Sequence, residues 1–391
     1  MHVLVSTGRF DPAAPDRPGL GAVEAAAAIV AGWQDARPED RVAAVPLNDG
    51  GPGLIDVLQA ARGGELIAVT VPDAGGEPVP SAVLVLTEDS GARTAYVDGS
   101  VALGGSAPVA EATTAGLGHL IRAALDTGAP RIVIGTGPRR VTAHDAGWGL
   151  LRVLLDEEDA RPSTADLVAL REALHDRDLV LLGHHDQALL GLNGASAALV
   201  EAGRATAEES QAIERRTADL VAALTTAAGP GRTHLLTTPH GHDHGHPPTA
   251  TAVTGTRPAV APGSGAGGGA AFALGLLGAR RVDGATWIAD AVRLADRVEA
   301  ADLVVTGVGV LDGTALEEGV VPAVSAVALP LGIPVIALAA QLRTGRRDWG
   351  AAGIAGAFEV VESPERAADW RAGPAAALRA RLPRIARTWS R

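Results

Sequence analysis

Glycines stand beside acidic side chains at four places where a short apolar run ends, and this combination could handle phosphate. The segments contain Asp49, Gly50 and Gly51; Gly135, Gly137 and Asp145; Gly183 and Asp186; and Gly307 and Asp312. Glycine lets backbone N–H groups approach phosphate oxygens. Carboxylates bind Mg²⁺ or accept a proton from an attacking hydroxyl group. Turns use the same residue types, but the recurrence predicts that at least two segments share a site suited to phosphoryl transfer.

The clearest of these segments covers residues 131–149. Its apolar residues 132–134 are short and β-branched, which predicts a strand buried on both faces. Gly135 and Gly137 remove side chains at the carboxyl end of that strand, where ligands bind in open α/β sheets. Asp145 precedes an apolar run of helical length, so it either caps that helix or acts on a ligand, and both interpretations stay open.

A glycine-rich run over residues 262–269 precedes an apolar helix expected at 270–277. It contains Gly263, Gly265, Gly267 and Gly268 and matches the pattern G-x-G-x-x-G. Prolines make the preceding residues a poor strand, and Asp283 follows two arginines rather than closing a second strand. The run therefore predicts a phosphate-binding or close-approach loop, with a flexible linker as the alternative.

Four histidines alternate with glycine or aspartate at positions 240, 242, 244 and 246. Such a run could bind a transition metal. A glycine-punctuated loop fixes ligands poorly, so we favour a solvated loop with adventitious metal affinity.

Composition narrows the classes of protein. The net charge of −12 argues against binding to nucleic acid or an anionic membrane. The chain has no lysine, which excludes a Walker-type phosphate loop, and no cysteine, which excludes disulfides and thiolate sites. We expect neither a secretion signal nor a transmembrane helix, and therefore a cytoplasmic protein.

The hydrophobic pattern predicts an α/β fold with two domains and mainly parallel sheets. Strands are expected at residues 3–5, 41–45, 66–71, 81–86, 93–97, 132–134, 179–182, 301–306, 333–338 and 355–361. Helices are expected at 20–33, 113–127, 167–174, 270–277, 286–300, 320–329 and 374–389. Strands 81–86 and 93–97 read as a hairpin, which marks a change of domain. We therefore expect a discontinuous Rossmann-like domain (1–75 plus 285–391) and an inserted α/β domain (76–284).

Segments in the same order along nearly the whole chain resemble the bacterial glycerate kinase family. Family motifs are matched at residues 46–53, 113–121, 184–196, 262–269 and 301–312 and echoed at 9–12 and 137–147. The resemblance implies two α/β domains with a cleft between them. It also implies transfer of the γ-phosphoryl group of ATP to a hydroxyl group of D-glycerate or a related small hydroxy acid, with Mg²⁺.

The resemblance makes Asp145 and Asp186 the candidate catalytic residues and the candidate Mg²⁺ ligands. Contacts with substrate or nucleotide are expected from Asp49, Gly50, Gly51, Gly135, Gly137, Asn193, Ser196, Gly263, Gly265, Gly267, Gly268 and Asp312.

Several charged residues of the family are replaced. Its early lysine is Asp11 here, its glutamate after Asp-Gly-Gly is Pro52, one aspartate is His184, and a glutamate and an arginine are Val308 and Val310. Arg9, Arg139 or Arg140 could supply the missing positive charge. One hypothesis is an active kinase, and the other is a catalytically inactive homologue that binds a ligand or regulates. A dinucleotide-dependent dehydrogenase is a distant third, and the oligomeric state, including a homo-oligomer, stays open.

Overall fold

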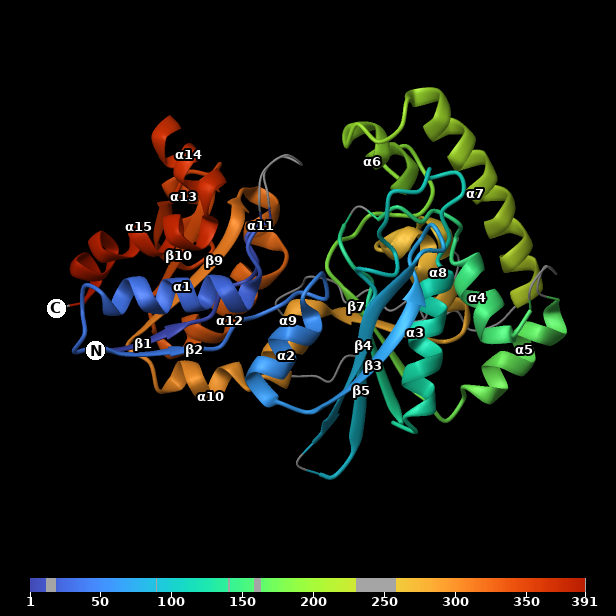
Figure 1. The fold of residues 1–391 in the computed structure, drawn as a ribbon, viewed down its shortest axis with the longest axis horizontal. Coiled ribbons are helices and arrows are strands. Elements are labelled where there is room, and N and C mark those ends of the chain that lie inside the picture. The colour runs from blue at the N-terminus through green and yellow to red at the C-terminus, as the bar shows by residue number, and fades with distance from the viewer. Residues whose placement is uncertain (12–18, 89, 140, 158–162, 230–257, 391) are drawn as a thin grey trace. The chain divides into compact units, whose positions relative to one another are not determined.

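The computed structural model describes the chain except residues 12–18, 89, 140, 158–162, 230–257 and 391 (Figure 1). The histidine run at 240–246 and Arg140 lie outside the described residues. The chain forms two compact units: unit 1 contains Met1–Asp49, Asp56–Gly63 and Gly284–Arg391, and unit 2 contains Gly50–Ile55 and Gly64–Asp283. The sequence predicts domain boundaries near residues 75 and 284. That these boundaries separate two independently folding domains stays a prediction.

Unit 1 contains a five-stranded parallel sheet in the order β11-β10-β9-β1-β2. The strands are β1 (His2–Val5), β2 (Arg41–Ala44), β9 (Leu303–Leu311), β10 (Val335–Leu342) and β11 (Ile354–Glu359). In β1, Val3 pairs with Val42 of β2 on one side and with Leu303 of β9 on the other. The chain leaves β1 in one direction and β9 in the other. Their carboxyl ends therefore form the point where strand order reverses, which is where open α/β sheets bind ligands.

Helices cover both faces of this sheet. They are α1 (Ala22–Gln34), α9 (Gly284–Ala291), α10 (Leu294–Glu299), α11 (Gly313–Glu317), α12 (Val320–Ala328), α13 (Arg346–Ala351), α14 (Pro364–Ala372) and α15 (Pro374–Trp389), with the 3₁₀ turn η3 (Leu329–Leu331). Val3 and Val5 pack with Ile29 of α1 and Leu382 of α15 in one buried cluster. Leu4 points to the opposite face and is also buried, and α12 packs on β9.

The sequence pattern predicts that Val23, Ala26, Ala27, Val30 and Trp33 form the inner face of α1, and this prediction was wrong in part. Ala26 and Trp33 are buried as expected, but Val23 is 37% exposed and Ala27 is exposed. Ile29 contributes the aliphatic contact instead. The alanines at 25–28 give no periodic signal, so Val23 was a misleading guide to the buried stripe, whereas Val30 packs against the core.

Two expectations for the segment between residues 280 and 300 were also wrong. The single helix expected at 286–300 breaks into α9 and α10 at Arg293, which has a φ of 54° in the left-handed region. The residues before Asp283 do form a short strand, β8 (Arg280–Asp283), which pairs with β7.

The strand expected to end at residue 306 continues to Leu311 through two glycines. A Cβ atom on Gly307 would lie 2.7 Å from Oγ1 of Thr7, and one on Gly309 would lie 2.1 Å from the carbonyl oxygen of Asp11. These glycines do not form a turn. Because they have no side chain, the chain that follows β1 can pack closely against β9.

Unit 2 contains a mixed six-stranded sheet in the order β3-β4-β5-β6-β7-β8. Its other strands are β3 (Glu65–Pro72), β4 (Pro78–Thr87), β5 (Arg93–Asp98), β6 (Arg131–Gly135) and β7 (Asp178–Gly183). Strands β3 to β5 are antiparallel, so β4 and β5 pair as the hairpin expected from the sequence. Strands β5 to β8 are parallel.

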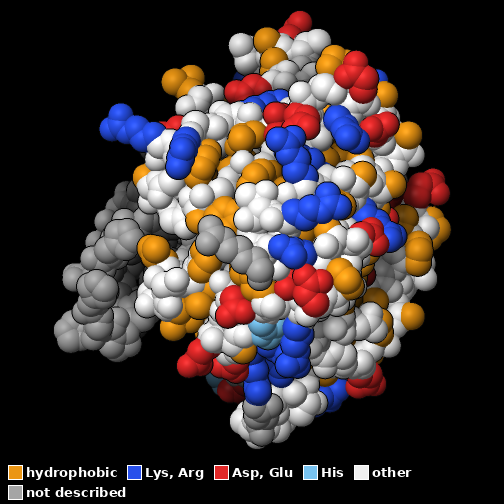
Figure 2. Space-filling view, turned by 90° about the vertical axis from the view of Figure 1, so that its left-hand side faces the viewer, with side chains coloured by type: hydrophobic (Ala, Val, Ile, Leu, Met, Phe, Trp, Pro, Cys, Tyr) orange, Lys and Arg blue, Asp and Glu red, His pale blue; other side chains and the backbone are white. Residues whose placement is uncertain are grey.

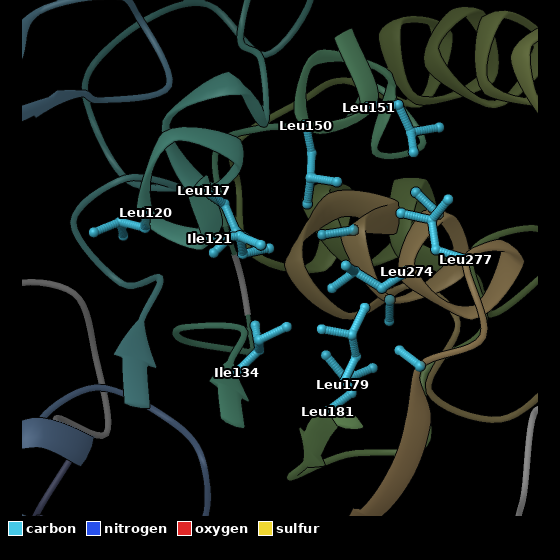
Figure 3. Close-up of a cluster of buried hydrophobic side chains, with 14 of the residues drawn as sticks. Leu117, Leu120, Ile121, Ile134, Leu150, Leu151, Leu179, Leu181, Leu274 and Leu277 are labelled. Atoms are coloured by element: carbon cyan, nitrogen blue, oxygen red, sulfur yellow. The ribbon is translucent and has the colours of Figure 1, made fainter. Parts of the chain in front are cut away.

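Aliphatic side chains build the core of unit 2. Its helices are α3 (Ala115–Asp126), α4 (Trp148–Leu155), α5 (Thr164–Ala173), α6 (Ala195–Glu201), α7 (Ala207–Ala228) and α8 (Ala270–Leu276), with 3₁₀ turns η1 (Pro258–Val260) and η2 (Ala266–Gly269); α2 (Leu54–Arg62) has residues in both units. Figure 3 shows Leu117 of α3, Leu150 of α4 and Leu274 of α8 with Ile134 of β6 and Leu181 of β7 in one buried cluster. This packing fixes the carboxyl ends of β6 and β7, from which the candidate site extends.

Two surface features bear on the expected partners. By length and composition, Gly313–Leu331 could cross a membrane, but the structure divides it into α11, α12 and η3, and Val321 and Val324 are buried. In Figure 2 arginine and acidic side chains lie close together. On unit 1, Arg379 pairs with Asp35 in this way. The absence of membrane and nucleic-acid partners stays a prediction.

Candidate functional site

The carboxyl ends of β6 and β7 lie side by side, because Gly135 pairs with Leu182 in the parallel ladder. Two of the four predicted segments therefore meet at one edge of the sheet. A Cβ atom on Gly135 would lie 2.7 Å from the carbonyl oxygen of Gly50, and one on Gly50 would lie 2.6 Å from Cβ of Leu182. These glycines allow the chain at residue 50, next to the buried Gly51, to approach both strands closely.

Asp145 accepts five hydrogen bonds. Oδ2 accepts from Oγ1 of Thr113 (3.0 Å) and from the N–H groups of Thr114 (2.9 Å) and Gly149 (3.0 Å). Oδ1 accepts from Oγ1 of Thr114 (2.9 Å) and from the N–H of Gly147 (3.0 Å). A carboxylate has about four lone-pair sites, so these donors fill it. Asp145 thus joins the N-terminal ends of α3 and α4, which supports the capping interpretation.

The glycine run packs against the loop that carries Asp145. A Cβ atom on Gly268 would lie 1.7 Å from the carbonyl oxygen of Ala143, and one on Gly269 would lie 2.5 Å from Cα of Ala146. A Cβ atom on Gly265 would lie 2.6 Å from a backbone oxygen of the chain after β7. Positive φ angles occur at Gly263, Gly267, Gly268 and Gly269. The run is therefore a buried close-approach loop, and the flexible-linker alternative was wrong; phosphate binding by this loop stays a prediction.

The guanidinium group of Arg281 packs against Gly183 and Gly263 at the end of β7, an arrangement called here the Arg281 cradle. Cβ atoms on Gly183 and on Gly263 would each lie 2.5 Å from Nε of Arg281. Nη2 of Arg281 donates to the carbonyl oxygen of His185 (2.8 Å) and pairs with Oδ1 of Asp186 (2.8 Å). Nε is buried and has no hydrogen-bond partner among the described residues. Gly183 at the end of β7 and Gly263 in the glycine run thus position a charge that local sequence patterns did not reveal.

His185 is buried beside this cradle and is neutral. Burial, and then the charges of His184, Arg139 and Arg281, lower its pKa to about 2. Its Nδ1 accepts from the N–H of Gln187 (3.2 Å), so the ring proton resides on Nε2. That N–H is buried, and no described residue accepts from it. A ligand oxygen at the edge of β7 could therefore receive this hydrogen bond.

Ser196 and Asn193 have different positions relative to this edge. Oγ of Ser196 donates to Glu214 (2.5 Å), and Glu214 also accepts from the N–H of Gly191 (2.8 Å). Ser196 therefore joins the start of α6 to α7. Asn193 is exposed in the turn before α6.

A further carboxylate, which the sequence analysis missed, is Asp98 at the end of β5. It accepts from the N–H groups of Gly53 (2.8 Å) and Leu54 (3.1 Å) and from Ser100. A Cβ atom on Gly137 would lie 3.0 Å from Cα of Ser100, so this turn borders the end of β6. Burial raises the pKa of Asp98, and these hydrogen bonds oppose that effect.

The remaining predicted residues belong to unit 1. Asp312 caps α11 by accepting from the N–H of Ala315 (3.0 Å). Oδ2 of Asp49 lies 3.5 Å from where a Cβ atom on Gly319 would be, at the start of α12. Convergence of these two residues with Asp145 and Asp186 on one site stays a prediction.

Metal ligation by Asp145 and Asp186 has little geometric support. Within the described parts of the chain, no group of three or more His, Asp or Glu side chains could hold a metal ion. Asp145 is filled by protein donors, and Asp186 already pairs with Arg281. The described side chains therefore form no complete Mg²⁺ site on their own, and ligation of Mg²⁺ by Asp145 and Asp186 together with nucleotide phosphates stays a prediction.

Comparison with known proteins identifies relatives over most of the chain. Residues 14–390 match the model of the glycerate kinase family. An uncharacterised protein of Mycobacterium bovis is 33% identical over 374 residues, which cover 93% of this chain and 84% of that protein. The glycerate kinase of Bacillus subtilis is 32% identical over 160 residues, 39% of each chain. The glycerate 2-kinase of Escherichia coli is 33% identical over 149 residues, 36% of this chain and 38% of that protein.

A solved structure shows the same fold. The crystal structure of a protein named as a candidate glycerate kinase 2 from Salmonella typhimurium LT2 has a TM-score of 0.68 and is 23% identical, covering 99% of this chain and 98% of that one. These matches confirm the resemblance and the mainly parallel α/β fold.

Proposed function

Because the chain belongs to the glycerate kinase family, we propose that it transfers the γ-phosphoryl group of ATP to a hydroxyl group of D-glycerate or of a related small hydroxy acid. The observation that supports this most is the cradle of Arg281 beside the exposed Asp186 at the carboxyl edge of the unit 2 sheet. Phosphoryl transfer needs fixed positive charge near the transferred group. In a chain without lysine, a preorganised arginine meets that need.

In the proposed reaction, the oxygen of the acceptor hydroxyl group attacks the γ-phosphorus, its proton passes to a carboxylate, and ADP leaves. Asp186 fits the role of base because its side chain is 57% exposed, and the pair with Arg281 would hold its carboxylate group in place. Arg281 and the Nε2–H of His185 would bind phosphate oxygens. Asp145 would act as a positioning residue that holds the loop against the glycine run. The role of Mg²⁺ stays a prediction, because ligation by Asp145 and Asp186 is untested.

The test is release of ADP in the presence of ATP, D-glycerate and a magnesium salt. Arg281→Gln should lower kcat by about 10²–10³, the usual effect of removing one preorganised group from such a site. Asp186→Asn should also lower kcat. Arg280→Gln is the matched control, because Arg280 lies on the same strand but pairs with Asp178. Full activity in Arg281→Gln would contradict the proposed role of this cradle.

A catalytically inactive homologue is the second candidate function. Two observations favour it. Protein donors already occupy the acceptor sites of the Asp145 carboxylate. Partly buried valines, Val308 and Val310 in β9, stand where the family has two charged residues. Binding of ATP, measured by calorimetry, without release of ADP in the presence of any small hydroxy acid would support this candidate. Measurable turnover would exclude it.

A further inference from the structure

A hollow in unit 2 lies between residues 108–110 and the first turns of α7. Its volume is about 370 Å³, within the range of sites for small ligands. Val109, Ala110, Ala212 and Ile213 give it apolar walls, and Arg204 and Arg216 bring two guanidinium groups to it.

Neither guanidinium is neutralised by a described side chain. Arg204 donates to Oγ1 of Thr142 (2.9 Å), and Arg216 donates to backbone carbonyl oxygens, including that of His144 (3.4 Å). Among the side chains that the structure describes, neither forms an ion pair. Each guanidinium has five N–H donors, so both keep donors for another acceptor.

The acidic residue that borders the hollow is occupied elsewhere. Oε2 of Glu209 accepts from the N–H (2.7 Å) and the hydroxyl group (2.9 Å) of Thr206 in the capping box of α7. The hollow therefore combines two arginines and one carboxylate held in a helix cap, a net positive charge, with apolar walls. A carboxylate or phosphate group on a short apolar body matches both features.

The same arginines contact the loop that leads to Asp145. Arg204 bonds to Thr142, and Arg216 bonds to the carbonyl group of His144, which directly precedes Asp145. The charges of Arg204 and Arg216 add to burial in lowering the pKa of His144 to about 4, which shows that their field reaches this loop. An anion held by both arginines would change that field and compete for their donors.

We propose that this hollow binds a small organic anion, with its carboxylate or phosphate group between Arg204 and Arg216 and its apolar part on Val109 and Ile213. Occupancy regulates phosphoryl transfer through the loop that carries Asp145, and this regulatory part rests on the proposed function. The site is separate in sequence from the glycine loops, from Arg281 and from Asp186.

Calorimetric titration of the full chain with inorganic phosphate, isovalerate and isovaleramide tests the site without ATP or an acceptor. Phosphate or isovalerate should bind at millimolar concentration, and the neutral amide should not. Arg204→Gln, which keeps a donor for Thr142, should weaken binding about tenfold or more. Ala212→Trp should block the hollow, and Arg215→Gln, a neighbouring arginine that does not line it, should leave affinity unchanged.

Failure of both anions to bind, equal binding of the amide, or unchanged affinity in both Arg204→Gln and Ala212→Trp would overturn the site. Rates of ADP release with and without the bound anion test the regulatory part. Unchanged rates at saturation would overturn regulation and leave the site standing. Absence of any turnover would contradict the proposed function, while the titration would still decide whether the site exists.

Discussion

At the scale of single residues, the five hydrogen bonds to Asp145 determine what its substitution can reveal. The acceptor joins segments 31 and 32 residues apart in sequence, so its loss should disturb structure as well as any chemistry. Activity of an Asp145 variant alone cannot separate catalysis from positioning. Stability can, because the structural bonds are present without substrate.

Asp145→Asn should lower the free energy of unfolding by about 2–3 kcal/mol, because the amide NH₂ faces backbone donors that the carboxylate oxygen accepted. Urea denaturation monitored by circular dichroism measures this. Asp312→Asn is the matched control: Asp312 accepts one helix-cap hydrogen bond, and asparagine caps nearly as well, so the loss should stay below about 1 kcal/mol. Equal losses in the two variants would contradict the special role of Asp145.

Buried histidines should make stability depend on pH. The ordinary histidine pKa is 6.5, whereas burial and neighbouring positive charges lower that of His144 to about 4 and that of His185 to about 2. Below 6.5 the unfolded chain therefore binds protons that the folded chain does not. Stability is fully present above 6.5 and decreases as the pH falls toward 4, by about 1.4 kcal/mol per pH unit for each group.

Urea midpoints at about pH 7 and about pH 5 measure this effect. His144→Gln should lose less stability between the two than the wild type, because one proton uptake is removed. His175→Gln should lose as much as the wild type, because the His175 side chain is 70% exposed. A wild-type midpoint that rises on acidification would contradict the assignment.

At the scale of elements, glycine acts mainly by letting backbones approach one another. Gly268→Ala should destabilise through both a φ of 67° and a clash with the carbonyl oxygen of Ala143. Gly203→Ala is its control, since Gly203 has a φ of 65° but no described atom within 4 Å of its Cβ position. Gly268→Ala should lose about 1–3 kcal/mol more than Gly203→Ala in urea denaturation. Similar losses of stability in the two variants would show that the glycine run can shift to accommodate the added methyl group.

Local pattern predicted the elements better than their partners. The uniform aliphatic runs at 132–134 and 179–182 identified β6 and β7, and the hairpin turn identified β4 and β5. The same pattern placed Asp145 before α4 but could not show that Thr113 and Thr114 would bind it. Arg281 was missed because its cradle comes from glycines at positions 183 and 263, which no local spacing connects.

At the scale of the whole molecule, the division into two compact units predicts two calorimetric unfolding transitions. Gly309→Ala, whose Cβ would clash with the backbone of Asp11 in unit 1, should lower one transition temperature. Gly268→Ala in unit 2 should lower the other. Gly313→Ala is the control for unit 1, because no described atom lies within 4 Å of its Cβ position. If both clashing variants shift one common transition, the units do not unfold separately.

The pairing of β1 with β9 joins residues about 300 positions apart, as in Val3 with Leu303. On the ribosome, β1 and β2 therefore emerge long before the strand that flanks β1 exists. All of unit 2, which ends at Asp283, has left the synthesis site by then. Domains fold as units during synthesis. Unit 2 can thus fold first. The sheet of unit 1 can form only after β9 (Leu303–Leu311) has been translated.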